Sequence, residues 1–200
     1  MTSSRRRIGL AAAVAAAMVA TAAPALAHTG LHVGGGLGAG LAHPFLGLDH
    51  VLAMLTVGAL AALAGGRSLW ALPLTFMAVM AAGGALGMAG VELPAVEQGI
   101  AASLIVFGAL LATRIGLPAP AAMLVVGVFA LFHGQAHGAE LPAMGSGAVY
   151  AAGFVLATGV LHLLGIGIAF GLARFERWAA PATRLAGGAV AASGALLLLA

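Results

Sequence analysis

HPFLGLDHVLAMLTVGALAAL, residues 43–63, is the stretch that decides the fold of this chain. It begins with His43 and Pro44, places Asp49 and His50 side by side, and then continues without another ionisable residue. An apolar segment of about 20 residues is long enough to cross the hydrocarbon core of a bilayer as a helix. Ionisable groups at the start of such a segment are costly to bury, so they are functional candidates.

The composition of the whole chain also indicates a membrane protein. Of its 200 residues, 62% are hydrophobic and 6% are charged, whereas a soluble domain carries roughly 25% charged residues. The mean hydropathy is +1.14. The 31 glycines are typical of membrane bundles, in which small residues let helices approach closely. The chain has no cysteine, which excludes disulfides and thiolate metal sites.

Residues 1–27 have the pattern of a cleaved secretory signal peptide. Arg5, Arg6 and Arg7 precede an apolar run over residues 8–23, and residues 25–27 form a small-residue cleavage site. An uncleaved first membrane helix is the alternative, although the run is short for a span. Cleavage leaves five arginines against five acidic residues. The mature chain is therefore almost neutral, and no nucleic-acid partner is expected.

We expect residues 28–200 to form a single transmembrane helical domain, all-α, with about six helices. Backbone polar groups must be paired internally in lipid, which favours helices over open strands. Residues 28–42 are glycine-rich and are expected to form an extended or half-helical approach to the first span. The expected helices lie near residues 44–64, 69–90, 96–113, 118–137, 147–172 and 179–200.

The arginines predict the orientation of this bundle. Those of the mature chain lie in alternate connections or just inside the last segment: Arg67, Arg114, Arg174, Arg177 and Arg184. The positive-inside rule makes that side cytoplasmic, and the signal peptide independently places the mature N-terminus outside. We therefore expect a multi-pass protein of the bacterial inner membrane, with its ligand-type residues in a vestibule on the periplasmic side.

A second cluster of ligand-type residues lies in FHGQAHGAE, residues 132–140. His133, His137 and Glu140 are spaced by four and three residues, so they project from one face of a helix. Two imidazoles one turn apart can share a divalent ion, and a carboxylate can complete its shell. Solvated histidines at a helix end are the alternative. Because the segment at residue 43 carries matching ligands, we expect the two clusters to face each other around a metal ion.

The arrangement of the first cluster remains open at this stage. On a straight helix His43 and His50 would share a face and Asp49 would point away. Distortion at Pro44 and Gly47 would bring all three onto one ion. Alternatively, Asp49 would accept a hydrogen bond from a ligating imidazole and fix its tautomer. A capping network at a helix start, without an ion, is the third interpretation.

Weaker candidates for secondary metal contact or relay are His28, His32, Met54, Glu97 and His162. Each has an ordinary alternative. The two N-terminal histidines would be an idle tail, Met54 would be core packing and Glu97 would be a helix-dipole partner. His162 is placed near the middle of its segment, deeper than the others, and is either a relay or a hydrogen-bonded packing residue.

The chemistry of these ligands narrows the choice of metal ion. Imidazole and carboxylate without thiolate suit Ni(II), Zn(II), Co(II) or Fe(II) better than Cu(I) or Mg(II). An intramembrane metal-dependent hydrolase is an alternative, but no H-E-x-x-H motif supports it. A scaffold or metal-delivery partner without a pathway of its own is another.

Five motifs in sequence order resemble the HupE/UreJ family of hydrogenase and urease accessory membrane proteins. They are HPFLGLDHVLAM, GGRSLW, LPAVE, FALFHGQAHGAE and ATGVLH, which begin at residues 43, 65, 93, 129 and 157. The resemblance covers essentially the mature chain. It implies a helical membrane bundle with a cleaved signal peptide, and a secondary permease rather than an enzyme.

The same resemblance implies the cargo and its path. The cargo would be Ni(II), imported for nickel enzymes such as hydrogenase or urease, with no permanently bound cofactor and an indirect link to their maturation proteins. Co(II) and Zn(II) are alternative cargoes. The implied metal-path residues are His43, Asp49, His50, His133, His137 and Glu140.

Overall fold

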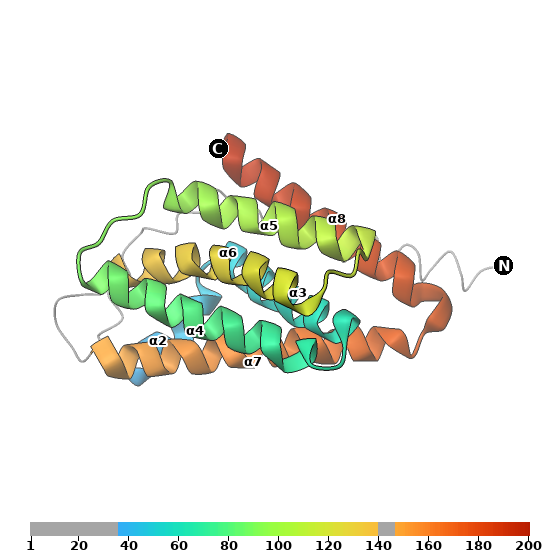
Figure 1. Ribbon diagram of the computed structural model, residues 1–200, viewed down its shortest axis with the longest axis horizontal. Helices are drawn as coiled ribbons and strands as arrows, with labels where there is room; N and C mark the ends of the chain where they lie inside the picture. The colour runs from blue at the N-terminus through green and yellow to red at the C-terminus, as the bar shows by residue number, and fades with distance from the viewer. Residues whose placement is uncertain (1–35, 140–146) are drawn as a thin grey trace.

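The computed structural model describes residues 36–139 and 147–200, and in these residues the chain is helical apart from short connections (Figure 1). The predicted all-α membrane bundle is confirmed. The predicted signal peptide, residues 1–27, lies outside the described residues. The helices are α2 (Leu37–Ala42), the 3-10 turn η1 (His43–Phe45), α3 (Leu48–Ala64), α4 (Ser68–Met88), α5 (Val96–Thr113), α6 (Ala119–Ala139), α7 (Gly147–Ala173) and α8 (Glu176–Leu199).

Among the described residues, α4 to α8 are each long and apolar enough to cross a membrane. A sixth span is formed only if residues 37–45 and 48–64 are taken together, and these two parts meet at an angle of 84°. The prediction of one helix over 44–64 is therefore wrong at its start. Pro44 lacks a backbone N–H, and Gly47 has an extended backbone, with φ −105° and ψ 117°. Both interrupt the helical hydrogen-bond ladder, so α3 begins at Leu48.

Helix α3 is central to the bundle. It contacts α4, α5, α6, α7 and α8, while α4 packs on α6, α5 on α8, and α2 on α7. In Figure 1, α5 and α8 form one side of the bundle, and α4 and α7 form the opposite side. The middle position of α3 brings its first turn, with Asp49 and His50, into the interior rather than against lipid.

Glycines allow these helices to approach closely. A Cβ added at Gly134 would collide with the backbone oxygen of Met80, and one at Gly165 would collide with that of Leu55. Close backbone approach through small residues is the usual packing of membrane helices. The close α4–α6 and α3–α7 contacts therefore depend on glycine, which has no side chain, at these two positions.

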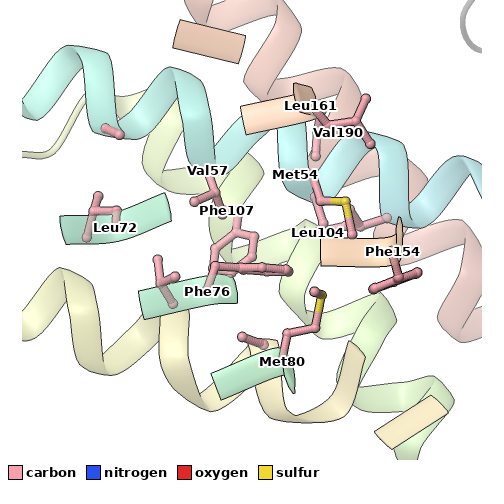
Figure 2. Packing of buried hydrophobic residues seen from close by; sticks show 14 of the residues in the cluster. Met54, Val57, Leu72, Phe76, Met80, Leu104, Phe107, Phe154, Leu161 and Val190 are labelled. Carbon is pink, nitrogen blue, oxygen red and sulfur yellow. The ribbon is translucent and has the colours of Figure 1, made fainter. Parts of the chain in front are cut away.

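The apolar core is built from residues of most of the helices and includes residues beside the histidines, such as Tyr150 and Phe154. Figure 2 shows Phe76 in this core with Met54, Leu72, Met80 and Phe107. Large apolar side chains also cover the outside of the described bundle, as a bilayer requires. Examples from four helices are Leu74, Leu124, Leu156 and Leu196.

The connections carrying arginines lie at one end of the bundle. Figure 1 shows the turns at residues 65–67, 114–118 and 174–175 at the right-hand end, and the connection at 89–95 at the opposite end. The alternation deduced from the sequence is therefore present in the fold. Which end faces the cytoplasm stays a prediction.

Candidate metal centre

The break between η1 and α3 shapes the first half of the site. Asp49 lies in the first turn of α3, where its Oδ1 accepts a hydrogen bond from the backbone N–H of His50 at 2.8 Å. The same oxygen is 2.8 Å from Nδ1 of the His50 ring. Because a carboxylate oxygen accepts, Nδ1 carries the proton and Nε2 keeps its lone pair. That Nε2 is buried and has no partner among the described residues.

Gly47 provides the space for this pair. A Cβ at residue 47 would lie 2.6 Å from Oδ1 of Asp49 and 2.8 Å from Nδ1 of His50. The backbone of Gly47 is extended, a conformation open to any residue. Glycine is therefore needed here for space, and a larger residue would push the carboxylate and the imidazole apart.

The second half of the site lies on α6, and a serine on α5 orients it. Ser103 donates from Oγ to the carbonyl oxygen of Ile100 at 2.6 Å. Its Oγ also lies 2.9 Å from Nε2 of His133. Since the hydroxyl proton is used, His133 donates from Nε2 and keeps the lone pair on Nδ1. Nδ1 of His133 is buried without a partner in the described structure.

The two halves meet in one group of rings, His43, His50, His133 and His137, which we name the imidazole cluster. The centroid of the His50 ring lies 4.8 Å from that of His133 and 4.3 Å from that of His137. The His43 and His137 centroids are 4.7 Å apart. His43 and His50 do not lie on one straight helix. The bend before α3 nevertheless brings both rings against His137 on α6.

Three members of this cluster, His50, His133 and His137, have ring nitrogens without hydrogen-bond partners in the described structure. Both nitrogens of His137, Nε2 of His50 and Nδ1 of His133 are buried without a hydrogen bond among the described residues. Leaving a buried polar group unpaired costs about 1–3 kcal/mol. The His43–His137 and His50–His133 ring pairs meet edge to face, and the His50–His137 pair is tilted. No three His, Asp or Glu side chains of the described residues already surround one point. Ion binding therefore requires the rings to turn so that their lone pairs converge.

A small cavity reaches the cluster between α4, α6 and α7. Its volume is ≈ 60 Å³, well below the roughly 300–1,000 Å³ of a drug-sized site. Its lining includes His137, Met80, Met88, Tyr150 and Phe154. Met88 ends α4 at the end of the bundle opposite the arginine turns. The cavity can hold a small ion or a few waters beside His137.

The remaining predicted residues lie elsewhere. Glu140, His28 and His32 are outside the described residues. Glu97 lies in the first turn of α5 and is exposed, unlike the imidazoles. Met54 is fully buried in the apolar core, and His162 is buried in the middle of α7.

Two polar residues of the site were missed from the sequence. Ser103 gives no signal, because a single serine is common in membrane helices. Gln135 lies between the two histidines of FHGQAHGAE, and that position was the available signal. Its Nε2 donates to the carbonyl oxygen of Val91 at 2.6 Å. This bond joins α6 to the connection between α4 and α5.

Comparison with known proteins identifies the family. The family model described as "HupE / UreJ protein" matches residues 16–197. The chain belongs to the HupE/UreJ family. This HupE/UreJ protein is 50% identical over 184 residues to Protein HupE of Rhizobium leguminosarum bv. viciae. The aligned residues cover 91% of the chain and 95% of that relative. No solved structure is significantly similar.

Proposed function

We propose that this HupE/UreJ protein is a permease for a divalent transition metal, with Ni(II) as the main cargo. The observation that carries the proposal is the imidazole cluster. Two spans place buried rings in contact, and Asp49 and Ser103 each fix a tautomer that leaves a lone pair unused. Hydrogen-bonded partners that hold the tautomer of a ligating imidazole are the usual support of a metal site.

The incomplete geometry suits transport better than storage. A carrier must bind its ion strongly enough to take it up and weakly enough to release it. Rings that turn to form the site, with centroids already 4.3–4.8 Å apart, favour exchange. Imidazole nitrogen suits Ni(II), and Co(II) and Zn(II) are the competitors to test.

The proposed direction is inward from the periplasm, across the bacterial inner membrane. It is supported by the separation of the imidazole cluster from the arginine turns along the bundle. The imported metal would supply nickel enzymes, such as hydrogenase or urease, through their maturation proteins. The role proposed for the chain itself involves no catalysis.

The test is nickel uptake into proteoliposomes containing the purified chain. We expect saturable uptake that is lost in His50→Ala and in His133→Ala. Thr183→Ala is the matched control, because Thr183 Oγ1 donates only to the carbonyl of Ala179 on the same helix. Added Co(II) and Zn(II) test the choice of cargo.

Two outcomes bear on the proposal separately. If cobalt is carried and nickel is not, the cargo is wrong and the path is retained. If folded wild-type protein carries none of these metals, or if both histidine variants carry nickel at the wild-type rate, the permease proposal is refuted.

A further inference from the structure

We propose that His162 is a second, inner cation-binding position, separated from the imidazole cluster by the ring of Phe76. The proposal rests on the permease function and specifies the next step of the path.

Two helices independently place His162 well inward of the cluster. On α7, His162 is eight residues beyond Phe154, whose ring lies 4.3 Å from that of His137. On α3, Gly58 is eight residues beyond His50, and a Cβ at Gly58 would collide with the carbonyl oxygen of His162. Eight residues of helix correspond to about 12 Å along the axis. His162 therefore lies at a different level from His50 and His137, and His133, one turn from His137 on α6, is the member of the cluster nearest to it.

The imidazole of His162 is unusual for a packing residue. Its side chain is 1% exposed, and neither ring nitrogen has a hydrogen-bond partner among the described residues. A leucine at this position would fill similar space without burying two unpaired polar atoms. An unsatisfied imidazole in the middle of a span is explained if its lone pair serves a passing ion.

Other donor atoms lie near this level. Thr158 is one turn before His162 on α7, and its Oγ1 donates to the carbonyl oxygen of Phe154 at 2.9 Å. The same hydroxyl lies 3.9 Å from Sδ of Met80. The hydroxyl and the thioether lie on the side of His162 that faces the imidazole cluster, and Met80 also lines the cavity beside His137. They are weak donors that an ion can pass between the imidazole cluster and His162.

Phe76 closes the way between the two positions. Its ring centroid lies 5.5 Å from that of His133 and 5.2 Å from that of His162. Phe76 is fully buried, and Figure 2 shows its side chain in the packed core. An ion passing from His133 to His162 therefore requires this ring to move.

The path opens again beyond this level. Leu72 is one turn inward of Phe76 on α4, and it lines a cavity of ≈ 120 Å³ together with Leu60 and Arg114. Arg114 ends α5 at the arginine-bearing end of the bundle. The level of Phe76 and His162 is thus the closed layer between the outer cavity beside His137 and this inner one.

The experiment compares His162→Leu with wild type in three measurements on the full chain: thermal stability, nickel binding in detergent and nickel uptake into proteoliposomes. We expect stability to be equal or higher, because two buried unpaired atoms are removed. Nickel binding to the imidazole cluster should be unchanged, whereas the uptake rate should fall by about tenfold or more. His162→Gln, which keeps a polar atom at the end of the side chain, should retain more uptake than His162→Leu.

Leu161→Met is the matched control, a change of similar volume at the neighbouring buried position. If His162→Leu binds nickel and takes it up at the wild-type rate, His162 is a packing residue and the inner position does not exist. If His162→Leu loses nickel binding as well as uptake, while His162→Gln binds and transports normally, the leucine has disturbed the fold and the inner position is likewise refuted. A wild-type protein that binds nickel but does not carry it would instead overturn the permease function.

Discussion

Ser103→Ala is the substitution that tests the metal centre most directly. The change removes one hydroxyl from a fully buried position on α5. In the wild type that hydroxyl accepts the Nε2 proton of His133 at 2.9 Å. In the variant, a proton on Nε2 has no acceptor, and a proton moved to Nδ1 occupies the nitrogen intended for the ion. Either tautomer is therefore worse for metal binding.

The expected loss of nickel affinity in Ser103→Ala follows from two separate considerations. A buried hydrogen-bonding group left unpaired costs about 1–3 kcal/mol. Loss of a residue that orients a metal-binding imidazole typically weakens affinity by about 10–100-fold. At about 1.4 kcal/mol for each factor of ten, these ranges agree. We expect nickel binding by Ser103→Ala to weaken by about 10–100-fold.

The assay is nickel titration of the purified protein by calorimetry, combined with uptake at low and high nickel. Because the defect lies in binding, uptake should fall at low nickel and recover substantially at saturation. Ser103→Thr keeps the hydroxyl and should bind within about threefold of wild type, since threonine forms the same backbone bond in a helix.

Ser193→Ala is the matched control for this experiment. Ser193 Oγ donates to the carbonyl of Ala189 at 3.0 Å on α8, so its loss also removes a helix hydroxyl. We expect nickel affinity to be unchanged. If folded Ser103→Ala binds nickel as tightly as this control, Ser103 does not set the tautomer of His133, and the reasoning about the site is refuted.

Three further substitutions have defined outcomes. Gly47→Ala should reduce nickel uptake by about tenfold, because the added Cβ displaces the Asp49–His50 pair that fixes the tautomer. Gly38→Ala is the control, because a Cβ there meets nothing within 4 Å. Equal uptake by the two variants would contradict the steric argument. Gly134→Ala should destabilise the protein by about 1–3 kcal/mol through overpacking. Gly127→Ala should not, because its added Cβ meets only methyl groups at 3.5 and 3.6 Å. Thermal unfolding of the two variants tests this difference in stability. Asp49→Asn should weaken nickel binding by about tenfold, because the bond to the imidazole loses its charge assistance; titration showing wild-type affinity would exclude that role.

The amino-acid sequence by itself determined the membrane class, the helical architecture and the alternation of the arginine connections. Hydropathy predicts the membrane helices here because each backbone N–H and C=O in lipid must be paired within its own segment. The ends of the later helices followed closely: the predicted 96–113 coincides with α5, and 147–172 differs from α7 by one residue. The two ligand motifs were also visible, since histidine and acid are rare in such segments.

Only the tertiary structure decided how those ligands are arranged. The bend at Pro44 and Gly47 turns His43 towards His137, and no helical period describes a broken helix. The tautomer of His133 depends on Ser103, a residue thirty positions away on another helix. Hydropathy and spacing are properties of one segment, whereas the proton position on an imidazole depends on the atom that packing places opposite it. For that reason the arrangement of the imidazole cluster was decided by the fold.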